Sequence, residues 1–215
     1  MFQMYQCPQP DCRFRFPAEI GDARAAICPR CHTPTQIVHA SFHNAETPLA
    51  TRPAPPIHAL LDNIRSIHNV GSMFRTADGA GLAHLYLCGI TATPTHPKLA
   101  KAALGAHETI PWSYHPNGWE TAVSLKNQGY QLWALEADPR ATPLLTPAIT
   151  LPAAPILLIV GNEKAGVDPA ILDECDHIYT LPMHGHKNSL NAAVAFGIAV
   201  YHLLYVNLTK EEANA

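Results

Sequence analysis

Apolar runs alternate with amphipathic segments along most of the chain. Five runs have the length of a strand and are rich in aliphatic and aromatic residues, which predicts strands at 57–62, 84–90, 130–137, 155–161 and 177–183. The segments between and after them predict helices at 70–79, 96–106, 117–129, 168–175 and 189–206. Apolar strands that alternate with helices predict an α/β domain with a mainly parallel sheet, covered by helices on both faces.

The last predicted helix lies within a long apolar segment, residues 190–208. A membrane-spanning helix takes roughly 17 to 25 residues, so the length alone is compatible with a span. Asn191, His202 and Asn207 would be costly in lipid, and the segment is therefore interpreted as a buried core or interface helix with no membrane contact. Residues 1–10 lack the basic start and the apolar run of a signal peptide, which favours a cytoplasmic protein.

Composition and charge limit the possible partners and the organisation of the chain. The formal net charge of −3 argues against a protein that coats nucleic acid through bulk positive charge, while a local basic site remains compatible with it. Prolines gather at 48–56 and 139–155, which are therefore interpreted as linker or loop. We predict a small domain, a Pro-rich linker, a main domain and a solvated tail, at 1–40, 41–56, 57–208 and 209–215.

Four of the six cysteines fall in the first 31 residues, within the segments CPQPDC and CPRC. Two cysteine pairs separated by a short span are typical of a zinc ribbon, and a segment of about 40 residues usually needs such a staple. In a reducing compartment the staple is generally a metal, and a disulfide-linked or reactive-thiol segment is the alternative. CPQPDC is longer than the usual knuckle, so His32 or His39 could also replace one cysteine. The predicted ligands of a structural zinc ion are Cys7, Cys12, Cys28 and Cys31.

Arginines and aromatic residues are interleaved around these cysteines. Arg13, Arg15, Phe14 and Phe16 form a plausible nucleic-acid surface, because arginines meet phosphates and aromatic rings stack on bases. We expect this ribbon to recruit RNA, and a ribbon that contacts only other proteins is an equally good interpretation.

Four of the predicted strands run into polar turns. In an open α/β sheet the ligand binds at the carboxyl ends of the strands, where loops enter helices. This rule selects the turns that follow residues 62, 137, 160 and 183. Glycines recur in and after them, as expected where the backbone turns sharply or approaches a ligand. The first strand is not followed by GxGxxG and the chain has no GxxxxGK[ST], so dinucleotide and P-loop sites are disfavoured.

Three of these turns carry extended motifs: NIRSIHNVGSMFRTADGAG at 63–81, LIVGNEKAGV at 158–167 and LPMHGHKNSLNAAVA at 181–195. In this order they resemble the three motifs of the SpoU-type RNA 2′-O-ribose methyltransferases, within the SPOUT superfamily. The segment KAALGAHETIPW is similar to the middle region of that family, and the resemblance covers residues 57–206. It implies a parallel sheet whose C-terminal part is threaded into a trefoil knot, S-adenosylmethionine as cofactor, tRNA or rRNA as partner, and a homodimer.

The resemblance also implies which residues carry the reaction. Asn69 and Arg75 match the first motif, and Glu163 matches the glutamate of the second. Arg75 is interpreted as a clamp on the target phosphate and a stabiliser of the developing alkoxide, because a guanidinium is practically never deprotonated. Glu163 is expected to orient Asn69 or Arg75, or to take the proton itself. Ser189 and Asn191 match the third motif, where Ser189 is expected to begin the last helix and Asn191 to face the site.

The expected contacts with S-adenosylmethionine are groups near strand ends: Leu135, Gly161, Leu181, Met183, Ser189 and Leu190. Two other functions stay open. One is a non-catalytic RNA-binding or assembly factor on a methyltransferase-like fold. The other is a methyltransferase with a base or a protein as acceptor, since such motifs fix the cofactor pocket better than the acceptor.

Overall fold

The structure, a computed structural model, describes residues 1–42, 57–146 and 149–213. The chain divides into two compact units, Met1–Thr51 and Arg52–Ala215. The predicted linker, apart from its first two residues, lies outside the described residues.

The N-terminal unit is a small antiparallel sheet with two cysteine-bearing turns. Its strands are β1 (Phe2–Gln6), β2 (Arg15–Glu19) and β3 (Gln36–Phe42), in the order β2-β1-β3. A short 3₁₀ helix, η1 (Ala23–Ala26), lies between β2 and the second turn. Asp22 caps this helix by accepting a hydrogen bond from the backbone N–H of Arg24 at 3.0 Å.

A seven-stranded parallel sheet forms the centre of the second unit. Its order is β6-β5-β4-β9-β7-β10-β8, and each neighbouring pair is parallel. The strands are β4 (Ile57–Asp62), β5 (His84–Cys88), β6 (Trp112–His115), β7 (Gln131–Leu135), β8 (Thr142–Pro143), β9 (Ile156–Val160) and β10 (His177–Thr180). The predicted parallel α/β fold is confirmed. The short edge strands β6 and β8 were not predicted.

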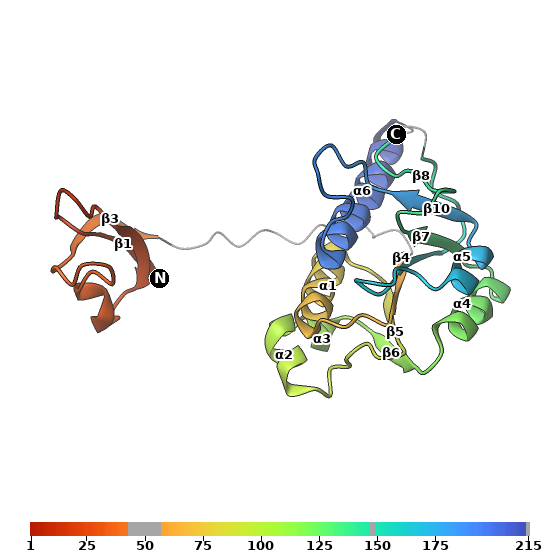
Figure 1. The fold of residues 1–215 in the computed structure, drawn as a ribbon, viewed down its shortest axis with the longest axis horizontal. Helices are drawn as coiled ribbons and strands as arrows, with labels where there is room; N and C mark the ends of the chain where they lie inside the picture. Colours follow the sequence, from red (N-terminus) through yellow and green to blue (C-terminus); the bar gives the residue numbers. More distant parts are fainter. Residues whose placement is uncertain (43–56, 147–148, 214–215) are drawn as a thin grey trace. The chain divides into compact units, whose positions relative to one another are not determined.

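Helices cover both faces of this sheet (Figure 1). One face carries α1 (Ile67–Ala80), α2 (Pro97–Ala103), α3 (Ala106–Thr109) and α6 (Ala192–Ala213), and the other carries α4 (Gly118–Asn127) and α5 (Pro169–Glu174). Alternate residues of each central strand supply the two apolar layers. In β9, Ile156, Leu158 and Val160 pack in the first layer, and Leu157 and Ile159 pack in the second.

Local capping residues set the ends of several helices. Asp168 caps α5 by accepting from Ala170 N–H, and Pro169 occupies the first helical position, as predicted. The predicted helix at 96–106 is interrupted, because Leu104 and Gly105 both adopt the left-handed conformation. It therefore becomes the two short helices α2 and α3.

The predicted start of the last helix at Ser189 is wrong. Helix α6 begins at Ala192, and the side-chain oxygen of Asn191 accepts hydrogen bonds from the N–H groups of Ala193 and Val194 at 2.9 and 3.3 Å. A residue that satisfies these free N–H groups occupies the cap position, so the helix begins just after it.

Helix α6 has one buried side and one exposed apolar side. Phe196, Ala199, Val200 and Leu203 are fully buried against the sheet layer that also contains α1. The exposed side carries Val194, Ile198, Tyr201 and Tyr205. In the part of the chain that the structure describes, no helix combines the length and the apolar character needed to cross a membrane.

Candidate functional site

Hydrogen bonds connect the loops at the carboxyl edge of the sheet. The β9–α5 loop contacts the β4–α1 loop through Asn162, whose side-chain N–H donates to the carbonyl of Asn63 at 2.7 Å. The side-chain oxygen of Asn162 accepts from the N–H groups of Lys164 and Ala165, which closes its own turn. Since β4 and β9 are neighbours in the sheet, these contacts hold two of the three motif-bearing loops side by side.

A chain of hydrogen bonds joins all three motifs. The carboxylate of Glu163 accepts from the side-chain amide of Asn69 at 2.7 Å, and the amide oxygen of Asn69 accepts from the side-chain N–H of Asn191 at 3.0 Å. Each of the two amide groups has used one N–H in these bonds, and each retains a second N–H. Within the described residues no further bond uses these two N–H groups, so each can donate to a ligand.

Glu163 is held as an ionised acceptor. Its oxygens also accept from the backbone N–H groups of Arg65 and Ser66 at 2.8 and 2.9 Å. Partial burial acts to raise the pKa of Glu163, but the backbone and side-chain hydrogen bonds together outweigh burial and lower the pKa below its usual value. A carboxylate with a lowered pKa is a weak base, so the geometry suits an orienting role for Glu163 better than proton removal.

A cavity of about 360 Å³ opens beside this hydrogen-bonded chain, between the ends of β7, β9 and β10 and the start of α6. Glu163 and Asn191 line it. All six residues expected to contact the cofactor also line this cavity: Leu135, Gly161, Leu181, Met183, Ser189 and Leu190. Its volume lies at the lower end of the range of about 300–1,000 Å³ that is usual for small-molecule sites.

The wall of the cavity requires glycine at position 161. A methyl group added at Gly161 would collide with main-chain atoms of Gly166 and Val167. These residues close the turn, in which the N–H and carbonyl groups of Asn162 and Gly166 pair at 2.8 and 3.0 Å. The close approach of the two backbone segments shapes this side of the cavity.

Sequence reasoning missed Glu136, which also lines the cavity. One of its oxygens accepts from the N–H of Val167 and the other from the N–H of Ala137, both at 2.8 Å. Glu136 therefore ties the end of β7 to the β9–α5 loop. The sequence offered one signal for Glu136, an acidic residue directly after a buried strand. Its partner, Val167, follows from the order of the strands in the sheet.

Arg75 lies apart from the hydrogen-bonded chain. It is exposed on α1, and no hydrogen bond or ion pair holds it within the described residues. It follows Asn69 by six residues, which at about 100° per residue places the two side chains about 120° apart around the helix. The structure thus brings Asn69, Glu163, Ser189 and Asn191 to one site in one subunit, and it does not bring Arg75 there.

Four thiols of the N-terminal unit converge from its two turns. The sulfur atoms of Cys7, Cys12, Cys28 and Cys31 all lie within 4.8 Å of one another. The Cys7–Cys31 and Cys12–Cys28 sulfur distances are 3.4 and 3.8 Å. A tetrahedral zinc–thiolate centre with Zn–S bonds of about 2.3 Å places its sulfurs roughly 3.8 Å apart, so the four thiols fit such a centre.

Two thiols in this cluster have pKa values shifted in opposite directions. Burial raises the pKa of the Cys7 thiol to about 12. Hydrogen bonding to the side chain and backbone of Thr33 lowers the pKa of the Cys31 thiol to about 6. Because a metal binds thiolates, occupancy of the cluster would be coupled to proton release.

Known proteins share this fold and are similar to this chain in sequence. The model of the SpoU rRNA Methylase family matches residues 56–201. The 23S rRNA (guanosine-2′-O-)-methyltransferase RlmB of Burkholderia sp. is 36% identical over 174 residues, which cover 78% of this chain and 66% of that protein. RlmP of Bacillus subtilis (strain 168), a 23S rRNA (guanosine(2553)-2′-O)-methyltransferase, is 37% identical over 183 residues, which cover 85% of this chain and 69% of that protein.

A solved structure with a similar fold is the AdoMet-bound rRNA methyltransferase from Sinorhizobium meliloti. It superposes with a TM-score of 0.64 at 27% identity, covering 70% of this chain and 56% of that chain. Fold and site together define a SPOUT-type α/β domain. The chain belongs to the SpoU rRNA Methylase family, as its motifs predicted. It spans 56% to 69% of the length of the first three relatives by sequence.

Proposed function

We propose that this protein is an S-adenosylmethionine-dependent methyltransferase that methylates a ribose 2′-hydroxyl of tRNA or rRNA. The observation that carries the proposal is the hydrogen-bonded chain from Glu163 through Asn69 to Asn191, whose two end residues, Glu163 and Asn191, line a ligand-sized cavity. The named activities of the relatives from Burkholderia and Bacillus support the same reaction.

The cavity is the proposed cofactor site. S-adenosylmethionine, when bound, supplies an electrophilic methyl group on its sulfonium. The lining of the cavity fits such a ligand, because it combines backbone groups at the strand ends with apolar side chains such as Leu135, Leu181 and Met183. The AdoMet-bound structural relative supports this choice. Binding is tested by the rise in melting temperature of the full chain on addition of S-adenosylmethionine.

The chain's own side chains position the acceptor. The second N–H of Asn69 and that of Asn191 are available to hold a ribose or phosphate oxygen while the reacting atoms line up. Arg75, always protonated, clamps the phosphate and stabilises the developing alkoxide, while the hydroxyl proton leaves to solvent water. Glu163 fixes the orientation of the Asn69 amide, and Ser189 stands at the cavity wall.

A homodimer is the proposed working form, because it explains the position of Arg75. The exposed apolar side of α6, with Val194, Ile198, Tyr201 and Tyr205, is suited to a second copy of the chain. Arg75 then serves the site of the partner subunit, since within one subunit it points away from Asn69.

The N-terminal unit is proposed to hold one structural zinc ion through its four cysteines. Zinc–thiolate chemistry favours a reducing compartment, which supports a cytoplasmic location. The rings of Phe14, Phe16 and Tyr5 are stacked in series, with centroids 5.5 and 5.9 Å apart. These rings, with Arg13 and Arg15 adjacent to Phe14 and Phe16 in the sequence, support a second contact of this unit with RNA.

The decisive experiment maps 2′-O-methylated nucleotides in RNA from cells with and without this protein. We expect at least one ribose methyl group to disappear without the protein and to return when the wild-type chain is restored. A chain with Asn191→Ala should not restore it. Unchanged methylation in the absence of the protein, together with no effect of S-adenosylmethionine on its melting temperature, would refute the proposal.

A further inference from the structure

A second cavity lies at the same edge of the sheet as the candidate site, on the β5–α2 loop and the end of β6. Its volume is about 540 Å³, and Thr91, Thr93, Thr95, His96 and Tyr114 line it. This volume lies within the usual range for small-molecule sites, about 300–1,000 Å³. Neither the three motifs nor the proposed cofactor site uses these residues.

Hydrogen bonds connect the β5–α2 loop, which lines the second cavity, to the β4–α1 loop. The side-chain oxygen of Asn63 accepts from the N–H of Ile90 at 3.2 Å. The buried hydroxyl of Thr91 accepts from the N–H of Ile64 and donates to the carbonyl of Leu61, both at 2.9 Å. The β5–α2 loop is thus bonded to the β4–α1 loop, whose N–H groups hold Glu163.

The sheet order places the two cavities within reach of one extended strand of RNA. Strand β5 is separated from β9 by β4 alone, so the ends of β5 and β9 lie two strand spacings apart, about 10 Å. A nucleotide whose ribose lies at Asn69 and Asn191 would bring its neighbour in the strand close to the second cavity.

Tyr114 supplies a fixed aromatic surface. Its hydroxyl donates to the carbonyl of Gly89 at 3.0 Å, while 49% of the residue remains exposed. The bond holds the ring in one orientation and leaves part of it open to solvent. An exposed ring with restricted motion is the kind of surface on which a base stacks.

Polar groups beside the ring match a sugar and a phosphate. The hydroxyls of Thr93 and Thr95 lie 2.7 Å apart. The Nδ1 atom of His96 accepts from the N–H of Lys98 at 3.2 Å, which leaves Nε2–H of the neutral ring as a donor. Lys98 follows Pro97, the last residue of the cavity lining, and it is exposed and forms no ion pair within the described residues. Hydroxyl donors, a cation and an aromatic ring together are typical of single-stranded RNA sites.

We propose that the second cavity binds a nucleotide of single-stranded RNA that flanks the nucleotide being methylated. The base stacks on Tyr114, and Thr93, Thr95 and His96 contact its sugar and phosphate. Lys98, one residue beyond the cavity lining, adds a positive charge. This inference rests on the proposed function. It adds a determinant of substrate choice, because a target whose flanking nucleotide is paired cannot enter the cavity.

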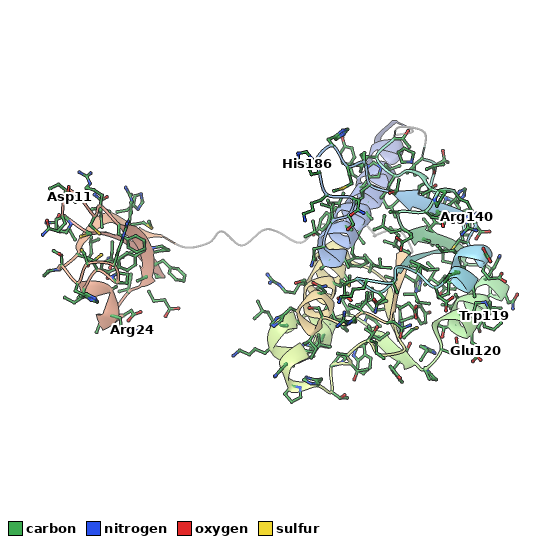
Figure 2. All side chains as sticks on the ribbon, in the orientation of Figure 1. Asp11, Arg24, Trp119, Glu120, Arg140 and His186 are labelled. Atoms are coloured by element: carbon green, nitrogen blue, oxygen red, sulfur yellow. The ribbon has the colours of Figure 1, made fainter. Side chains whose placement is uncertain are left out.

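The test measures binding of the full chain to a fluorescein-labelled oligoadenylate of about ten nucleotides by fluorescence anisotropy at constant salt. Tyr114→Ala is expected to weaken binding roughly tenfold, the usual effect of losing one stacking ring. Tyr114→Phe keeps the ring but loses its bond to Gly89, so it should bind less tightly than wild type and more tightly than Tyr114→Ala. Trp119→Ala is the matched control, because Trp119 is an exposed aromatic residue on α4 outside the cavity (Figure 2).

The S-adenosylmethionine-induced rise in melting temperature is measured on the same variants and should not change, which shows that they are folded. Equal affinities of Tyr114→Ala and Trp119→Ala for the oligonucleotide would overturn the inference, and so would equally tight binding of an RNA duplex of the same length. If the wild-type chain neither binds S-adenosylmethionine nor methylates RNA, the proposed function itself fails. If it does both and Tyr114→Ala remains unaffected, only the flanking site fails.

Discussion

Single side chains in the candidate site serve the fold and the proposed reaction at once. The oxygen of Asn191 caps α6, while its N–H group holds the amide of Asn69. Glu163 fixes two backbone N–H groups of the β4–α1 loop and also the Asn69 side chain. Because the same atoms are shared, a substitution at either position has a structural and a functional component that must be separated.

Two substitutions at Asn191 separate its roles. A serine hydroxyl keeps the helix cap but does not donate to Asn69 in the same way, whereas alanine loses both contacts. We expect both variants to lose RNA methylation, and only Asn191→Ala to lose about 1 kcal/mol in the free energy of unfolding. Urea titrations and methylation assays measure the two effects. Full activity of Asn191→Ser would show that the amide N–H is dispensable.

Glu163 makes the stability of the protein depend on pH in acid. Its folded pKa is lowered, so the ionised carboxylate stabilises the fold above the unfolded pKa of about 4.3, and this stabilisation is lost as pH falls through the folded pKa. The difference in unfolding free energy between wild type and Glu163→Gln should stay constant from about pH 7 to 5 and shrink below about pH 4. Urea titrations across this range measure it.

Glu120→Gln, at an exposed position on α4, controls for the loss of a carboxylate elsewhere (Figure 2). A difference between wild type and Glu163→Gln that grows as the pH falls would contradict a lowered pKa.

The sequence predicted the residues of this site better than it predicted their partners. Asn69, Glu163 and Asn191 stand in motifs at strand ends, and in an open parallel sheet such ends meet at one edge. The sequence did not identify Glu136 and Asn162 as the residues whose hydrogen bonds connect the loops. Their partners, Val167 and Asn63, depend on β9 lying between β4 and β7, an order that no local pattern in the chain specifies.

At the scale of elements, apolar runs predicted the five inner strands of the parallel sheet, and they did not mark the edge strands β6 and β8. Strand β6 reads Trp112, Ser113, Tyr114 and His115, and none of these residues is fully buried. An edge strand has only one neighbour and need not be apolar, so it lacks the signal that marked the central strands. The start of α6 was misplaced for a related reason, since the polar turn before it contains several residues able to cap a helix.

The β9–α5 loop gives the clearest prediction for an element. Gly161→Ala places a methyl group against the main chain of Gly166 and Val167, so the turn cannot close as it does now. We expect the variant to lose the rise in melting temperature that S-adenosylmethionine gives to the wild type. Gly185→Ala is the matched control, because an added methyl group there meets no atom within 4 Å. Equal responses of the two variants would show that the turn does not shape the cofactor site.

At the scale of the whole molecule, the chain has a small cysteine-bearing unit and a SPOUT-type domain, and the expected zinc ribbon and trefoil knot stay predictions. The two units differ in the size of their apolar cores. The main domain has a large apolar core on both faces of its sheet. Among the residues of the N-terminal unit whose burial the structure describes, the buried apolar ones are Cys7, Ala25 and Cys28, so we expect this unit to depend on a staple provided by its cysteines.

Metal removal should therefore affect the two units differently. Purified protein is expected to contain about one zinc ion per chain, and a strong chelator should make residues of the N-terminal unit sensitive to protease. The thermal transition of the larger unit should persist. Cys12→Ser should lose the metal, whereas the control Cys175→Ser, outside the cluster, should keep it. Elemental analysis and limited proteolysis measure these outcomes, and a metal-free protein with a protease-resistant N-terminal unit would contradict them.

The position of Arg75 yields the last prediction, which concerns the assembled protein. If Arg75 serves the site of a partner subunit, then Arg75→Ala and Asn191→Ala damage different halves of one composite site. Each variant alone should be inactive. After the two are unfolded together and refolded, roughly a quarter of wild-type methylation should return, because half of randomly formed dimers are mixed and each mixed dimer keeps one intact site. Ile198→Arg, on the exposed side of α6, should prevent both dimer formation in sedimentation experiments and this recovery. Recovery by a mixture that stays monomeric, or no recovery by a mixture that forms dimers, would mean that Arg75 does not complete a neighbouring site.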